Sequence, residues 1–173
     1  RDAVDEGGRW EATYHLYEEY ASYKYDSAYS YALALGELAA RTGIRDLMAE
    51  ACVAKITCLI NAGLFKEAFE AAGEISDNGL SPRVQLNYYR IMVRLYYSAR
   101  GYAQTEPYWE QYSQAGEYFS RKVLEAVPEN SRIWHEYNAN LLMESRQFEE
   151  GVVEFASLLE SPGLDLHSRA IYL

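Results

Sequence analysis

The side chains that could carry chemistry are few in this sequence, and they are scattered. The three histidines, His15, His135 and His167, stand far apart, and none forms a His-x-x-x-His or Glu-x-x-His pair that would bind a metal ion. Neither a glycine-rich phosphate loop nor a Gly-x-Ser-x-Gly nucleophile turn occurs. We therefore predict no catalytic group, no metal site and no cofactor, and we predict that the chain is not an enzyme.

The two cysteines, Cys52 and Cys58, are predicted to be free thiols. They lie six residues apart on one predicted helix, which separates them by about 9 Å along its axis at ~1.5 Å per residue. A disulfide does not tolerate that separation. Because cysteine is among the most often buried residue types, we expect both thiols to be mostly buried.

The charge of the chain argues against two classes of partner. The formal net charge is −10, from 26 acidic and 16 basic residues. A surplus of carboxylates opposes binding to phosphates, so nucleic acid and anionic membrane surfaces are poor candidate partners, and we predict no nucleic-acid binding through this segment. No apolar run approaches the roughly 20 residues of a membrane-spanning helix, so we predict no direct membrane insertion of this segment.

A repeated turn pattern indicates the elements that position the remaining side chains. An aromatic residue precedes a small residue by three positions in Tyr25 to Ala28, in Phe65 to Ala68 and in Phe148 to Gly151. We expect the aromatic to fill the corner of a helical hairpin, and the small residue to let the two helices approach closely. A more divergent copy has its first helix ending near Gly101, and Gly116 takes its small-residue position.

Residues that are typical of helix starts and ends lie between the predicted hairpins and support this division. Gly43 is expected to end a helix, and Asp46 is a candidate N-cap of the next one. Ser81 followed by Pro82 indicates a third start, and Ser131 a fourth. The predicted pairs cover residues 9–42, 46–77, 81–127 and 131–161, and a further helix over 165–173 is expected to be cut off in progress, in a segment of a longer protein.

This arrangement resembles the tetratricopeptide repeat (TPR), whose 34-residue unit carries such an aromatic and small residue. The resemblance implies an all-α fold, a right-handed TPR-like α–α superhelix of about four helix pairs plus the start of a fifth. It forms a single domain over residues 1–173.

A closer resemblance rests on particular runs of sequence, and it covers roughly residues 10–172. The runs at 20–29, 62–69, 94–97 and 106–108 are similar to the extracytoplasmic TPR part of membrane-anchored regulatory proteins of Bacteroides-type bacteria. In that family a transmembrane helix and a cytoplasmic signalling part follow the repeats. The resemblance implies a periplasmic location, with a cytoplasmic one as the alternative, and it implies no particular ligand.

The inner surface of a TPR array is lined by the first helix of each pair, so counting back from the turn aromatics predicts the binding residues. The positions obtained are Thr57, Asn61, Arg90, Arg94, Tyr97 and His135. Arg90 and Arg94 lie one helical turn apart, so they can converge on one carboxylate or phosphate. Alternatively, both arginines pair with carboxylates such as Glu117 or Glu136 and hold the array together.

These observations favour binding as the function. The leading hypothesis is a sensor or scaffold segment that binds a protein or peptide. One alternative is a self-assembly module, giving a possible homodimer, and another is a glycan-binding lobe like that of outer-membrane carbohydrate receptors.

Overall fold

The computed structural model describes residues 2–103 and 105–160, which form eight α-helices and no strand. The predicted all-α, TPR-like solenoid is thereby confirmed, whereas the predicted helix over 165–173 lies outside the described residues. The helices are α1 (Asp2–Ala21), α2 (Tyr25–Thr42), α3 (Arg45–Asn61), α4 (Phe65–Ala72), α5 (Pro82–Tyr102), α6 (Tyr108–Ala126), α7 (Arg132–Glu144) and α8 (Phe148–Glu160).

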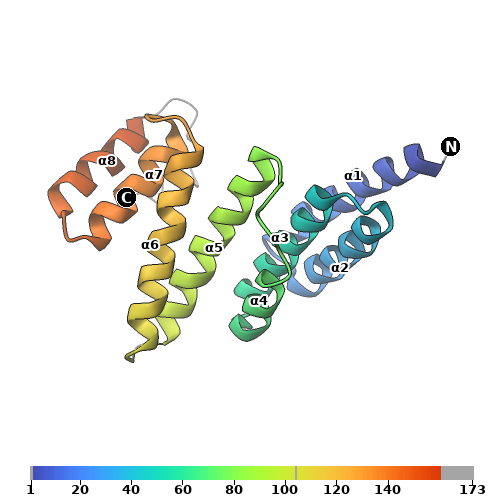
Figure 1. Cartoon of the computed structure of the whole chain (residues 1–173), viewed down its shortest axis with the longest axis horizontal. Coiled ribbons are helices and arrows are strands. Elements are labelled where there is room, and N and C mark those ends of the chain that lie inside the picture. Colours follow the sequence, from blue (N-terminus) through green and yellow to red (C-terminus); the bar gives the residue numbers. More distant parts are fainter. Residues whose placement is uncertain (1, 104, 161–173) are drawn as a thin grey trace.

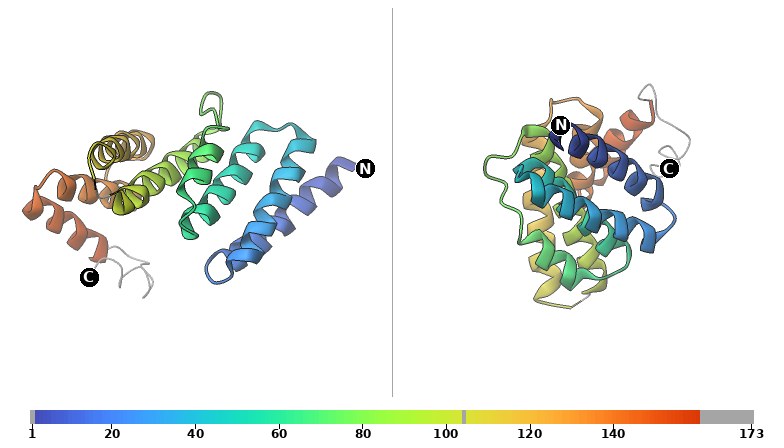
Figure 2. Two further views of the ribbon diagram at one scale, coloured as in Figure 1. Left: turned by 90° about the horizontal axis from the view of Figure 1, so that it is seen from below. Right: turned by 90° about the vertical axis from the view of Figure 1, so that its right-hand side faces the viewer.

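Consecutive helices form four hairpins, α1–α2, α3–α4, α5–α6 and α7–α8, that follow one another along an elongated array (Figure 1). Neighbouring hairpins join through α2 against α3, α3 against α5, and α6 against α7. Seen from below, the array is longer than it is wide, with α1 at one end and α7–α8 at the other, and the second view looks along it from the α1 end (Figure 2). Each hairpin therefore packs on its neighbours in sequence, as in other repeat proteins.

Helix α3 is buried on two sides, and it links the two core clusters of the molecule. Ala51, Ala54 and Cys58 pack with residues of α1 and α2. Ile56 and Leu59 pack with α4 and α5 instead. Since both faces are covered, α3 is apolar over most of its surface and acts as the central helix of the first two hairpins.

Both cysteines are free and lie against this core, as the sequence predicted. Burial raises the pKa of each thiol, of Cys52 and of Cys58, to about 11. The Cys52 Sγ also donates to the carbonyl oxygen of Ala71 in α4, at 3.1 Å. The two thiols are therefore packing groups held in their protonated form.

The small residues of the turn pattern are all buried, which confirms their predicted role in close helix packing. Ala28 and Ala68 are 2% and 0% exposed, and Gly116 and Gly151 are buried as well. A Cβ built on Gly116 would lie 2.7 Å from the Tyr97 ring. The hairpin α5–α6 is therefore closed by an aromatic ring that packs directly on a glycine.

The turn aromatics differ from one another, and the expectation that each fills a hairpin corner is wrong for two of them. Phe65 is partly buried, and its ring contacts that of Tyr102, from the following hairpin, at 5.0 Å between centroids. Tyr25 and Phe148 are 37% and 54% exposed. Tyr25 stacks on Tyr29 of its own helix, and Phe148 has no described helix beyond α8 to cover it. A following hairpin does not by itself bury the turn aromatic, since Tyr25 is exposed although the hairpin α3–α4 follows it.

Two of the predicted helix boundaries carry the expected caps. Gly43 is left-handed, with φ of 65°, and its N–H donates to the Ala39 carbonyl at 3.1 Å. The Ser131 hydroxyl accepts a hydrogen bond from the Trp134 N–H at 3.2 Å. Both are standard ways to satisfy the free backbone groups at a helix end.

The assignment of Asp46 as an N-cap is wrong. Helix α3 begins at Arg45 after Ile44, so Asp46 lies inside the first turn. Its carboxylate accepts the backbone N–H of Ser81, the residue that precedes α5, at 3.0 Å. Hydrogen bonds from Ser81 lower the pKa of Asp46 below its ordinary value. The carboxylate thus joins two hairpins instead of capping its own helix.

Candidate binding site

A cavity of about 540 Å³ opens between the first helices of the four hairpins, and we call it the inner cavity. Side chains from α1, α3, α5 and α7 line most of it, and α6 contributes one residue. Its lining consists of Tyr14, Tyr17, Val53, Thr57, Asn87, Arg90, Ile91, Val93, Arg94, Tyr97, Ser120, Glu136, Tyr137 and Asn140.

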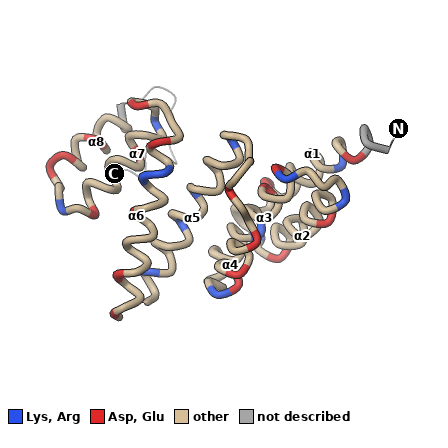
Figure 3. Tube along the Cα trace, in the orientation of Figure 1, with Lys and Arg blue, Asp and Glu red and all other residues tan. Residues whose placement is uncertain are grey.

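Helix α5 presents a polar stripe to the inner cavity. Asn87, Arg90, Arg94 and Tyr97 are spaced by three or four residues, so they share one face of the helix. In the charge-coloured trace of Figure 3, basic segments recur along α5 while acidic segments are spread over the rest of the array. This stripe is the most cationic part of the cavity wall.

Four of the six predicted site residues, Thr57, Arg90, Arg94 and Tyr97, line the inner cavity. Asn61 lies at its edge, in an adjoining hollow of about 670 Å³ that shares Thr57 and Arg94 with it. The Arg94 guanidinium donates to the Asn61 side-chain oxygen, which links α5 to α3. The structure therefore brings these five residues together across two helices.

The sixth predicted residue, His135, lies in α7 but is not among the lining residues of the inner cavity. Its Nδ1 is 2.6 Å from a carboxylate oxygen of Glu154 in α8. The other oxygen of Glu154 accepts a hydrogen bond from Asn138 at 3.1 Å, and the Trp134 ring packs edge-on against the imidazole. His135 thus joins the two helices of the last hairpin.

Among the described residues, neither carboxylate named in the alternative hypothesis pairs with Arg90 or Arg94. Glu117 accepts hydrogen bonds from Arg121 of its own helix, α6, at 2.7 and 3.2 Å. Glu136 lines the inner cavity, but no ion pair between it and Arg90 or Arg94 occurs among the described residues. Arg90 and Arg94 are therefore not paired with either carboxylate.

Sequence reasoning missed the contribution of α1. Tyr14 and Tyr17 form the wall opposite α5, and burial raises the pKa of Tyr17 to about 12. A usable signal was present, because Tyr17 precedes the turn aromatic Tyr25 by eight residues, just as Thr57 precedes Phe65. Counting back in the first hairpin, as in the second, finds the tyrosine.

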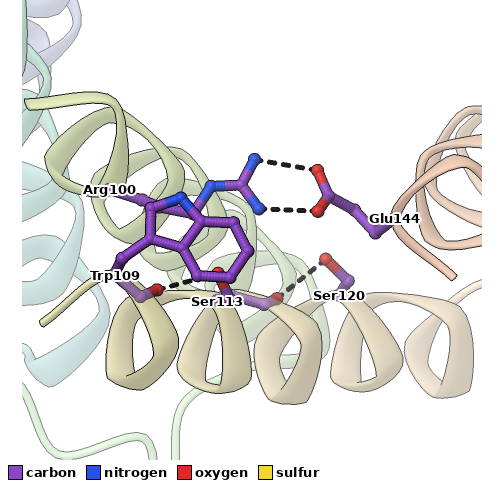
Figure 4. A network of polar contacts seen from close by, with 6 residues as sticks. Arg100, Trp109, Ser113, Ser120 and Glu144 are labelled. Carbon is purple, nitrogen blue, oxygen red and sulfur yellow. Dashed lines mark hydrogen bonds and ion pairs between the residues drawn. The ribbon is translucent and has the colours of Figure 1, made fainter. Parts of the chain in front are cut away.

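Tyr97 is held in place beside the cavity by Arg100, whose own contact with Glu144 is drawn in Figure 4. The Arg100 guanidinium lies 4.6 Å from the Tyr97 ring centroid and 5.7 Å from that of Trp109. It donates to both carboxylate oxygens of Glu144 in α7, at 2.6 and 2.8 Å. Such bidentate, stacked arginines have little freedom. The Tyr97 ring is therefore held by contacts from both α5 and α6.

Within residues 2–103 and 105–160, no three His, Cys, Asp or Glu side chains lie together in a group that could hold a metal ion. In that part of the chain, no helix combines the length and the apolar character needed to cross a bilayer.

Comparison with known proteins gives one family. The chain matches the family described as the SusR N-terminal TPR domain over residues 2–173. No curated protein and no solved structure matched it. TPR domains typically act as non-catalytic scaffolds for protein–protein interaction, through the surface that stacked repeats create. Because the match spans all but the first residue, the chain belongs to the SusR N-terminal TPR domain family.

Proposed function

We propose that this domain binds a protein or peptide partner in the inner cavity, and that it serves as the sensor part of a membrane-anchored regulator. The observation that carries the proposal is the cavity itself, which collects polar and aromatic side chains from all four consecutive hairpins, from Tyr14 in α1 to Asn140 in α7. A partner seated there contacts all four hairpins at once. Its binding would then favour one relative arrangement of the hairpins over others.

The proposal includes no catalysis and no contact with nucleic acid. The formal net charge of −10 opposes binding to a phosphate backbone. In a regulator, contact with DNA would belong to another part of the protein. A titration of fluorescent duplex DNA at physiological salt should show no saturable binding to this segment.

Photo-crosslinking in cells that make the full-length protein tests the binding surface. A crosslinking amino acid is placed at Asn87 or Asn140, both in the inner cavity, and at Leu33 as the control. Leu33 is 44% exposed on α2, outside the cavity. We expect the same covalent product from both cavity positions and not from Leu33. Products from Leu33 alone would refute the assignment of the surface.

In this proposal the domain lies outside the cytoplasm. The Lys66 side chain is 84% exposed, so an amine reagent that crosses only the outer membrane should label it in intact cells. Protection of Lys66 until the inner membrane is opened would show a cytoplasmic domain instead.

Self-assembly is a second candidate, and one observation favours it. Phe148, Val152 and Val153 of α8 are 54%, 59% and 66% exposed, an apolar group at one end of the array. If copies associate there, sedimentation velocity should show a concentration-dependent dimer that Val153→Glu abolishes. A monomer at all concentrations would eliminate this function.

A further inference from the structure

We propose that the partner enters the inner cavity as an extended acidic peptide, with a carboxylate held between Arg90 and Arg94. This inference rests on the proposed function, because it names the chemistry of the ligand for the same surface.

The arginines along α5 fall into two groups. The outer two are satisfied within the fold, since Arg83 pairs with Glu50 of α3 and Arg100 with Glu144 of α7. The inner two are different. Arg94 donates only to the neutral amide of Asn61, and the side chain of Arg90 has no hydrogen bond or ion pair among the described residues. Two guanidinium groups one turn apart thus lack a carboxylate, and both line the cavity.

The local charge is opposite to that of the whole protein. The inner cavity is lined by two arginines and one glutamate, so its formal charge is positive in a chain with a formal net charge of −10. Both arginines are exposed, and unpaired cationic groups gathered on a concave surface raise the local positive potential and so attract an anion. A guanidinium also offers its donors in a planar fork that fits a carboxylate. Charge complementarity therefore selects an anionic occupant.

The rest of the lining favours a peptide as the source of that carboxylate. Asn87 and Asn140 stand in the cavity wall near the arginines. An asparagine amide carries both donors and an acceptor, which matches the N–H and C=O groups of an extended backbone. Asn140 uses one N–H on the Glu136 carbonyl at 2.8 Å, which leaves its side-chain oxygen to accept. Tyr14 and Tyr17 supply an aromatic wall for the side chains of the peptide.

The test uses a defined probe, a capped peptide of alternating aspartate and glycine, against its asparagine counterpart of equal length. An oligogalacturonate of similar charge is the third arm. Binding is followed by NMR through the side-chain Nε–H signals of Arg90 and Arg94 in the isotope-labelled domain. We expect both signals to shift saturably with the aspartate peptide, and only weakly with the asparagine peptide.

Two variants and a matched control accompany the titration. Arg90→Gln and Arg94→Gln should each weaken binding of the aspartate peptide by about tenfold or more, the usual worth of one charge-assisted hydrogen bond. Arg121→Gln, which removes an exposed arginine of α6 outside the cavity, should leave it unchanged. Since Arg90 has no ion pair in the described fold, Arg90→Gln should also keep the melting temperature of the parent, so its effect reports binding alone.

The outcomes distinguish failure of this inference from failure of the proposed function. Equal binding of the aspartate and asparagine peptides, or an unaltered affinity in Arg90→Gln, would overturn the inference. Binding of the oligogalacturonate without the peptide would overturn it too, in favour of an acidic glycan. If no acidic peptide binds but the crosslinks at Asn87 and Asn140 form, the inference fails while the proposed function stands.

Discussion

Replacing Gly116 by alanine should destabilise the domain, although alanine is ordinarily the better helix former. Gly116 lies in the middle of α6, where an added Cβ would be 2.7, 2.9 and 3.0 Å from the Tyr97 ring atoms Cε1, Cζ and Cδ1. Real Cβ atoms essentially never approach closer than 3.0 Å, so the ring or the helix has to shift. The ring has little room to do so, because Arg100 stacks on it and is itself fixed by two hydrogen bonds to Glu144.

Two opposing contributions set the change in the free energy of unfolding that Gly116→Ala causes. Alanine gains about 0.8–1.0 kcal/mol over glycine inside a helix, and overpacking costs about 1–3 kcal/mol. Gly36→Ala is the matched control, since Gly36 lies inside α2 and a Cβ there meets nothing within 4 Å. The gain in helix propensity from glycine to alanine is common to both variants. The difference in their free energies of unfolding should therefore isolate the contact with Tyr97, about 1–3 kcal/mol.

Urea unfolding followed by far-ultraviolet circular dichroism measures this difference. We expect Gly36→Ala to be more stable than the parent and Gly116→Ala to be less stable than Gly36→Ala, with a shift in Tm of roughly 2–4 °C per kcal/mol. Because repeat arrays can unfold in parts, the comparison requires equal denaturant slopes. If the two alanines stabilise the domain equally, the packing of Tyr97 on α6 is refuted. In a Tyr97→Leu background the difference between them should shrink.

Three further predictions follow from the packing of the array. Ala68 is fully buried, so Ala68→Leu should cost about 1–3 kcal/mol by overpacking, while Glu149→Gln on the exposed surface stays within about 0.5 kcal/mol in the same urea experiment; equal effects would mean that the repeat register is wrong. Arg100→Lys should lower stability by about 1–2 kcal/mol, since lysine cannot reproduce the bidentate, stacked contact, and an unchanged thermal midpoint would contradict that role. With pKa values of about 11 for Cys52 and Cys58, only ~0.1% of each thiol is ionised near pH 8. A disulfide reagent should therefore label them slowly in the native domain and quickly in urea, and rapid native labelling would show the thiols to be accessible.

The sequence by itself determined the helices, the hairpins and most of the candidate site. Helical periodicity and the buried small residues, such as Ala68 and Gly116, act within one or two turns, so they are visible in a short stretch of chain. Because the pattern repeats, a position assigned in one hairpin identifies the equivalent position in another. Counting back from a turn aromatic identified Thr57, Arg90, Arg94 and Tyr97 as residues of one inner surface, and the structure places all four in the same cavity.

Only the tertiary structure decided which polar groups meet. Arg83 reaches Glu50 across 33 residues and Arg100 reaches Glu144 across 44. In the described part of the chain, neither Glu117 nor Glu136 forms an ion pair with Arg90 or Arg94. Asp46 is likewise bonded to a residue of the next hairpin. The loops between hairpins differ in length, so the repeat alone does not fix how one hairpin sits on the next. A local pattern contains no measure of that placement, so the sequence could identify the inner face but could not say which of its arginines are left without a carboxylate.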